Sequence, residues 1–183
     1  MQTDSPVTVE VSILRTPREL DARSEATLMA SLTLNERDRF ARIPSRRRAL
    51  EFLYGRAMLR LSRNVYTSVS HSRGCVTTAS ARCPVGIDVA AWSPSIDRIV
   101  QRFFTASEKQ WLDEMSLEDR RNASVRLWAI KEACCKVWKK GLRFPLTPVH
   151  VPLAETGYTD ELAWRLIDLK GTHALCVAVA RSN

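Results

Sequence analysis

Apolar residues recur every three or four positions in two long stretches of the chain, residues 46–63 and 117–140. This spacing predicts two long amphipathic helices, one in each half of the sequence. Shorter stretches with a similar pattern predict four further helices, at residues 19–29, 36–43, 95–104 and 107–115. Thr105 and Glu108 have the T-x-x-E spacing of a capping box, which predicts the start of the last of these four helices.

Between and after the helices, β-branched and apolar residues predict short strands. Residues 7–14 alternate before the first helix, and residues 65–91 hold several β-prone runs that are broken by serine, glycine and proline. Three more strands are predicted at residues 150–153, 163–169 and 174–180, with a hairpin turn at 170–172 between the last two. This order of elements predicts an α+β fold in which helices lie on mostly antiparallel strands.

The composition is that of a globular protein. The 183 residues are 45% hydrophobic, enough for one domain or for two small lobes that share a core. No apolar stretch approaches the roughly 20 residues that a membrane-spanning helix needs, and residues 1–6 lack the pattern of a secretory signal. The five cysteines, an odd number without a C-x-x-C pair, are interpreted as reduced thiols. We therefore expect a cytoplasmic protein with no membrane partner.

Positive charge is in excess, with 28 lysines and arginines against 20 aspartates and glutamates, and a net charge of +8. Such a charge attracts polyanions, so a nucleic acid, a phosphate-rich cofactor or an acidic protein would each fit. The arginines between residues 37 and 48 could serve a nucleic-acid-binding protein, but no zinc finger, recognition-helix signature or aromatic RNA-binding string accompanies them. Nucleic-acid binding is therefore the less favoured alternative, and no nucleic-acid partner is expected.

Residues 128–136, with the sequence WAIKEACCK, lie within the second long helix and carry candidate chemistry. At about 100° per residue, one side of this helix is apolar and suited to a core. The other side gathers a carboxylate and several ammonium groups; its members are Trp128, Lys131, Glu132, Cys135, Lys136 and Lys139. One interpretation is a solvated face with an ordinary ion pair between residues four apart. The other is a phosphate and metal site, because lysines hold phosphate oxygens and carboxylates hold Mg²⁺.

Two shorter motifs make the second interpretation more specific. In residues 85–89, VGIDV, the valines and isoleucine alternate toward a core, so Asp88 faces the other way. Two carboxylates from separate elements, Asp88 and Glu132, could hold one Mg²⁺ on a diphosphate. The tripeptide Ser70-His71-Ser72 offers two hydroxyls and an imidazole as hydrogen-bond donors to phosphate, although such a tripeptide is more often an ordinary loop.

These motifs occur in one order along the chain, and the sequence resembles the surfactin-type phosphopantetheinyl transferases over roughly residues 36–145. The resemblance rests on the strings SHS at 70–72, GID at 86–88, FTxxE at 104–108, WxxKEAxxK at 128–136 and GL at 141–142, together with RAxLR at 56–60. WxxKEAxxK is the most specific of them.

The resemblance implies two similar α+β lobes, here 1–90 and 91–183, with coenzyme A and Mg²⁺ in the cleft between them. It implies transfer of the 4'-phosphopantetheine group of coenzyme A to a serine of an acyl or peptidyl carrier protein. An acidic carrier protein would fit the positive net charge of this chain. By the same resemblance Asp88 and Glu132 are the metal ligands and, with Lys136, the catalytic residues. The implied coenzyme A contacts are Ser70, His71, Lys131, Lys136, Arg48 and Arg56.

Two departures from the family pattern stand out. Members often read GIDxE, but here the last position is Ala90, so one carboxylate of the metal site is missing. The segment between Arg60 and Ser70 is also shorter than in the family, which suggests a trimmed first lobe. Both departures leave open a degenerate member that binds coenzyme A or the carrier without turnover.

Overall fold

The computed structural model describes residues 7–139, 154–169 and 173–181. Within them the chain forms six helices and seven strands. In chain order these are β1 (Val9–Arg15), α1 (Ala22–Ala30), α2 (Leu34–Ala41), α3 (Arg46–Arg60), β2 (Tyr66–Ser72), β3 (Cys75–Ala81), β4 (Val85–Ala90), α4 (Ile96–Phe103), α5 (Ala106–Asp113), α6 (Leu117–Val137), β5 (Thr156–Tyr158), β6 (Leu162–Asp168) and β7 (Ala174–Ala180).

The strands form two antiparallel sheets with related topologies. The first sheet has the order β1-β3-β2 and the second the order β4-β7-β6-β5. In each half a strand is followed by helices, the last of them the longest, and then by strands that pair back onto the first. With β5 set aside, the order β4-β7-β6 repeats the order β1-β3-β2.

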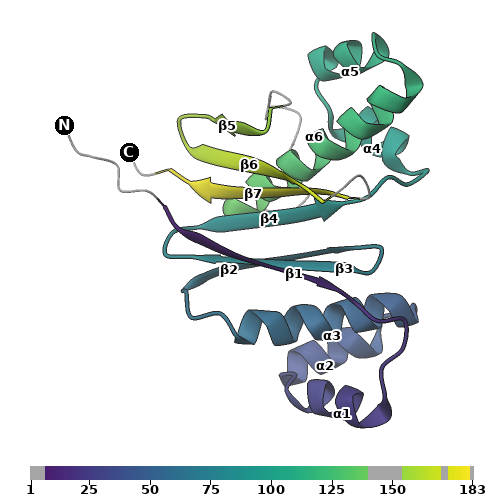
Figure 1. Cartoon of the computed structure of the whole chain (residues 1–183), viewed down its shortest axis with the longest axis vertical. Coiled ribbons are helices and arrows are strands. Elements are labelled where there is room, and N and C mark those ends of the chain that lie inside the picture. The colour runs from purple at the N-terminus through teal and green to yellow at the C-terminus, as the bar shows by residue number, and fades with distance from the viewer. Residues whose placement is uncertain (1–6, 140–153, 170–172, 182–183) are drawn as a thin grey trace, which may run out of the picture.

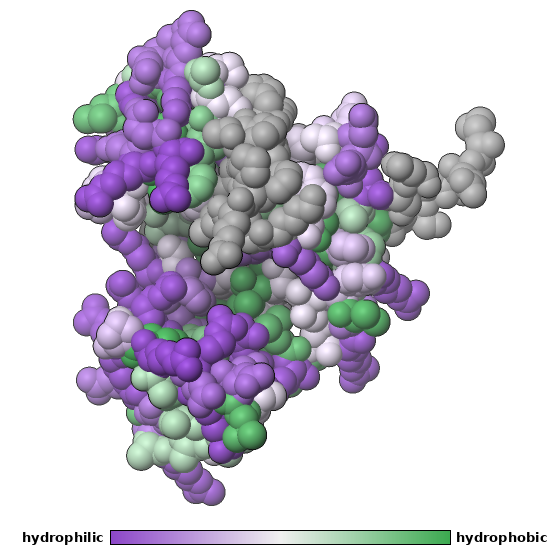
Figure 2. Space-filling model, turned by 180° about the vertical axis from the view of Figure 1, so that it is seen from behind, coloured by the Kyte–Doolittle hydropathy of each residue, from purple (hydrophilic) through white to green (hydrophobic). Residues whose placement is uncertain are grey.

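The two sheets lie in the middle of the molecule, with helices outside them (Figure 1). An apolar cluster between the sheets joins β3 to β4 and β7 and includes Ala79, Ile87 and Leu175. A second cluster packs α6 onto the outer face of the second sheet, and a third joins α3 to the short helices of the first half. Hydrophilic side chains dominate both helical ends of the face seen in Figure 2.

Most of the predicted helices and strands are present, but they begin or end at residues other than those predicted. The strand β7 begins and ends at the predicted residues. The capping box is confirmed: Thr105 N–H donates to Glu108 at 2.8 Å, and Glu108 N–H donates to Thr105 Oγ1 at 3.1 Å. The short strand β5 was not predicted, because its three residues are too few to show a pattern. The predicted strand at 150–153 and turn at 170–172 lie outside the described residues.

The α+β class is correct, but the predicted division between residues 90 and 91 does not follow the sheets. β4 pairs along its whole length with β7, so it belongs to the second sheet, and the change of sheet falls at residues 82–84. All five cysteines are free thiols, as expected. In the part of the chain that the structure describes, no helix is long and apolar enough to cross a membrane.

Candidate active site

A pocket of about 420 Å³ lies between the two halves of the molecule. The first half contributes polar side chains from α3 and β2, among them Arg48, Ser70 and His71. The second half contributes Glu132 and Lys136 from α6 and an edge of β4. Its remaining described lining is formed by Val69, Ser72, Asp88, Val89, Ala90, Ala91, Ser93, Ile96, Ile99 and Trp128.

Gly86 allows α6 to lie directly against β4. A Cβ atom at this position would be 1.9 Å from the carbonyl oxygen of Ala133, far inside contact distance. Asp88 is two residues farther along the strand and therefore projects to the same face, toward the helix. Glu132 and Lys136 are one helical turn apart and flank Ala133, so the close packing brings all three ionisable groups together. The glycine of the GID string thus has a direct steric role.

Asp88 is buried, with 6% of its surface exposed, and its charge is compensated from both halves of the molecule. Lys136 Nζ donates to Asp88 Oδ1 at 2.8 Å and also to the carbonyl oxygen of Ile87 at 2.9 Å. Ser70 Oγ of β2 donates to the same Asp88 oxygen at 2.7 Å. One carboxylate oxygen therefore ties β4 to α6 and to the edge of the first sheet.

Glu132 lines the same pocket, but none of the described side chains forms a hydrogen bond or ion pair with its carboxyl group. Burial, followed by the negative charge of Asp88, raises the pKa of Glu132 to about 7, and Lys136 opposes the rise only in part. A carboxyl group with this pKa exchanges its proton near neutral pH, as a general base for a hydroxyl group must. The burial and the charge pattern of the pocket therefore suit Glu132 to proton transfer.

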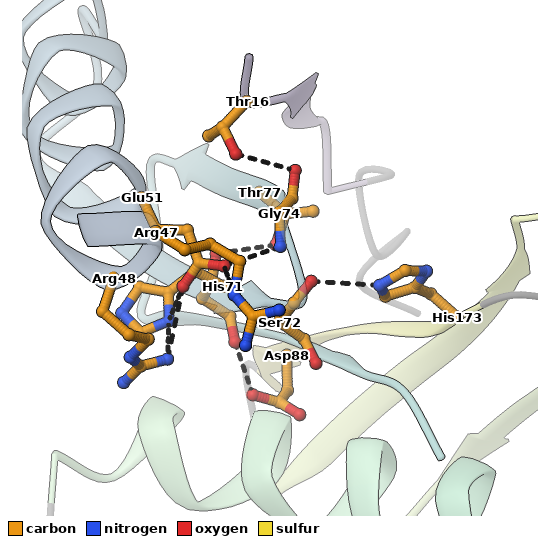
Figure 3. Close-up of polar contacts among 11 residues, drawn as sticks. Thr16, Arg47, Arg48, Glu51, His71, Ser72, Gly74, Thr77, Asp88 and His173 are labelled. Atoms are coloured by element: carbon orange, nitrogen blue, oxygen red, sulfur yellow. Dashed lines mark hydrogen bonds and ion pairs between the residues drawn. The ribbon is translucent and has the colours of Figure 1, made fainter. Parts of the chain in front are cut away.

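On β2, neighbouring residues point to opposite sides of the strand, so Ser70 meets Asp88 while His71 turns toward α3. There Nη1 of Arg48 lies 2.6 Å from Nδ1 of His71 (Figure 3). Burial, followed by the charge of Arg48, lowers the pKa of His71 and favours the neutral imidazole. Glu51, fully buried on α3, lies beside both groups. Glu51 was not predicted from the sequence. The available signal was its position four residues after Arg47 and three after Arg48, the spacing of ion pairs on one face of a helix.

The structure corrects the predicted placement of Lys131. This side chain has no exposed surface, and its Nζ lies 3.0 Å from a carboxylate oxygen of Glu108 and 5.5 Å from the ring centroid of Phe104. Burial lowers the pKa of Lys131, and the contact with Glu108 opposes this effect. Lys131 therefore lies inside the second half of the molecule, where it meets Glu108 of α5, and it does not line the pocket.

Arg56 is also outside the pocket. Its guanidinium lies over the ring of Phe52 at 5.2 Å and 3.7 Å from Glu36, on the side of α3 that packs against α2. Of the eight predicted site residues the structure thus brings six to one pocket, namely Arg48, Ser70, His71, Asp88, Glu132 and Lys136.

Comparison with known proteins identifies the family. Residues 84–178, just over half of the chain, match the 4'-phosphopantetheinyl transferase superfamily. The chain belongs to this superfamily. The match begins at β4 and ends within β7, so it covers the second sheet and the helices packed on it. The resemblance seen in the motifs is confirmed.

Two curated members of the superfamily show how far the similarity extends. A 4'-phosphopantetheinyl transferase of Bacillus subtilis is 28% identical over 123 residues, covering 67% of this chain and 52% of the relative. The 4'-phosphopantetheinyl transferase psf-1 of Bacillus pumilus is 33% identical over 103 residues, covering 56% of this chain and 44% of the relative. The chain thus spans about half the length of the curated relatives it matches.

The donor set of this superfamily member fits Mg²⁺ in part. Asp88 and Glu132 bring two carboxyl groups to the pocket. Burial and then repulsion by Asp88 raise the pKa of Glu132, and a cation would offset both effects. Mg²⁺ is commonly bound through one or two carboxylates together with substrate phosphates and water. Among the described residues no cluster of three histidine, cysteine, aspartate or glutamate side chains forms a metal cage, and Ala90 lines the pocket beside Asp88.

Proposed function

We propose that this chain transfers the 4'-phosphopantetheine group of coenzyme A to a serine of an acyl or peptidyl carrier protein. The observation that carries the proposal is the gathering of Asp88, Glu132 and Lys136 from the second half, and Ser70, His71 and Arg48 from the first, around one pocket. Membership of the superfamily and the names of the two relatives support the same reaction. The cofactors in this proposal are coenzyme A as co-substrate and Mg²⁺.

In the proposed reaction the hydroxyl oxygen of the carrier serine attacks the β-phosphorus of coenzyme A. The bond from that phosphorus to the oxygen of the α-phosphate breaks, and 3',5'-ADP leaves. A serine hydroxyl is a weak nucleophile at neutral pH and needs a base. Glu132 is the candidate base, or the group that orients the base, because its carboxyl group lies in the pocket beside Asp88.

The charges around the pocket suit a diphosphate. Lys136 and Arg48 carry positive charge that phosphate oxygens attract, and Ser70 and His71 add groups that can donate hydrogen bonds. Bound Mg²⁺, with Asp88 and Glu132 as ligands, would offset negative charge on the phosphates. Stabilisation of this charge and positioning of the two substrates supply most of the catalysis in phosphoryl transfer.

The net charge of +8 favours an acidic carrier protein as the partner, through long-range attraction. The free thiols fit the reducing cytoplasm, where the proposal places the reaction. A second candidate is a member that binds coenzyme A or carrier without turnover. Ala90, in the place of a carboxylate, and the half-length match to the relatives favour this second candidate.

The two candidates separate in one experiment. The protein is incubated with coenzyme A, MgCl₂ and a panel of apo-carrier proteins, and the carriers are weighed by intact mass spectrometry. Transfer adds the mass of one phosphopantetheine group, and the Asp88→Asn variant should lose it, because the amide binds cations poorly. Coenzyme A binding without any mass gain across the panel would favour the non-catalytic member, and absence of both would reject the proposed function.

A further inference from the structure

Glu51 is a charged residue in a fully buried position, next to the pocket but not lining it. A buried carboxylate is costly unless hydrogen bonds and opposite charges compensate it. Here Gly74 N–H donates to Oε1 at 2.6 Å and Arg48 Nη1 donates to Oε2 at 3.4 Å. Arg47 adds a second positive charge, with its Nε 3.9 Å from Oε1. The carboxylate thus has a defined place between α3 and the first sheet.

The turn that Glu51 contacts directly follows His71 and Ser72. Ser72 and Cys75 are paired across a two-residue hairpin, in which Arg73 and Gly74 have φ of 46° and 80°, the type I' geometry. In this turn the Gly74 N–H points toward α3 and donates to the carboxylate of Glu51 (Figure 3). Glu51 therefore fixes the end of β2, and with it the backbone that carries His71.

The contact between Arg48 and His71 determines which ring nitrogen of the histidine carries hydrogen. A guanidinium group has only donors, so at 2.6 Å Nδ1 of His71 must be the acceptor. The neutral ring then carries its hydrogen on Nε2, and no described residue forms a hydrogen bond with Nε2. A phosphate oxygen accepts hydrogen bonds and cannot donate them in its ionised form, so only this tautomer attracts it through Nε2.

We propose that Glu51 is a positioning residue, which holds Arg48 against Nδ1 of His71 and so keeps His71 as the Nε2–H donor for a phosphate of the ligand. Oε2 of Glu51 lies beside this contact, 3.4 Å from Nη1 of Arg48 and 3.6 Å from Nδ1 of His71. The ligand part of this inference rests on the proposed function, whereas the tautomer is a property of the protein alone.

The tautomer is measured directly in the free protein. Long-range ¹H–¹⁵N spectra of protein with labelled histidine distinguish protonated from unprotonated ring nitrogens, and a His71→Phe variant assigns the signals. In the wild-type protein we expect hydrogen on Nε2 of His71. Glu51→Gln keeps an acceptor for Gly74 N–H but removes the charge, and we expect a substantial population with hydrogen on Nδ1. Arg48→Met should give the same change, and the two substitutions combined should add little.

Ligand binding is measured by calorimetry with 3',5'-ADP and with coenzyme A. Loss of one hydrogen bond to a charged group predicts roughly tenfold weaker binding for Glu51→Gln. The matched control is Glu25→Gln, which removes a carboxylate from another α3 arginine, Arg46 at 2.5 Å, away from the pocket. The control should change neither the tautomer nor either affinity.

Two results would overturn the inference: wild-type His71 with its hydrogen on Nδ1, or an unchanged tautomer in folded Glu51→Gln protein. A tautomer that shifts as expected while both affinities stay at the wild-type value would refute the phosphate contact of His71. That outcome would count against the proposed function and leave the link between Glu51 and the tautomer intact.

Discussion

The close contact between Gly86 and α6 can be tested by adding a single methyl group. In Gly86→Ala the new Cβ would lie 1.9 Å from the carbonyl oxygen of Ala133 and 3.0 Å from both the carbonyl carbon of Ala133 and the nitrogen of Val137. Carbon and oxygen atoms normally stay roughly 3.3 Å apart, so strand and helix would have to separate by roughly 1.4 Å. The obstacle is helix backbone, which cannot rotate away as a side chain can.

Two consequences follow from this separation. Overpacking of a core costs about 1–3 kcal/mol, and a backbone obstacle places Gly86→Ala near the upper figure. At about 2–4 °C per kcal/mol for a protein of this size, Tm should fall by about 6–12 °C. The bond from Lys136 Nζ to Asp88, 2.8 Å long, would also be broken, and a 1 Å misplacement can cost about 10²-fold in rate.

Calorimetric unfolding and coenzyme A binding are measured together on Gly86→Ala and on Gly55→Ala. Gly55 is also a buried glycine, but a Cβ there would meet side-chain carbons, Val69 Cγ2 at 3.1 Å and Val76 Cγ1 at 3.6 Å. Alanine is also favoured over glycine within a helix by about 0.5–1 kcal/mol, so Gly55→Ala should stay within about 1 kcal/mol of the wild type. Equal stabilities and affinities for the two variants would refute the steric argument.

Three further predictions concern residues that line the pocket. Lys136→Ala should weaken coenzyme A binding by about tenfold or more, and the difference from the wild type should shrink as the salt concentration rises, because salt screens the charge of Lys136. The control is Lys109→Ala on α5, and an equal loss of affinity in both variants would refute the contact between Lys136 and coenzyme A. The pKa of Glu132 is about 7 in the folded protein against an ordinary value of 4.5, so between pH 4.5 and pH 7 the folded state binds more protons than the unfolded state. The stability that protonated Glu132 contributes is therefore present at low pH and is lost as the pH rises through 7. Glu132→Gln should therefore be more stable than the wild type at pH 8, by at most about 3 kcal/mol, with a smaller difference at pH 5, and denaturant unfolding at the two pH values checks the sign. Ala90→Glu should lower the Mg²⁺ concentration for half-maximal transfer, because residue 90 projects to the same face as Asp88; an unchanged or higher requirement would mean that a glutamate at position 90 does not reach the ion.

The sequence was informative where a feature depends on neighbouring residues. Helical spacing predicted α3 and α6, alternation placed Asp88 on the face opposite Ile87, and the T-x-x-E spacing predicted the capping box. Each of these patterns follows from backbone geometry within one or two turns or across one strand. The ordered motifs also indicated the family, because they sample both halves of the chain.

Features that depend on distant residues were not visible in the sequence. Lys131 and Glu132 are adjacent and both charged, so helical spacing placed them on one polar face. In the fold Lys131 meets Glu108 of α5 inside the core, whereas Glu132 lines the pocket. Glu51 was not predicted, because its local signal is limited to arginines one turn earlier, whereas the hairpin at Gly74 supplies its backbone hydrogen bond. A partner 23 residues away leaves no periodic signal.

The contacts of Asp88 link the two halves of the molecule to the chemistry of the pocket. Ser70 from the first sheet and Lys136 from α6 donate to the same oxygen of this carboxylate, at 2.7 and 2.8 Å. A rearrangement of either half would therefore leave a buried charge with one donor fewer, which is costly in a low-dielectric site. A ligand that binds Lys136 and the β2 side chains together would draw on groups from both halves, and by mass action it would stabilise their contact. If the proposed substrate binds these groups, its occupancy of the pocket would be coupled to the packing of the two halves.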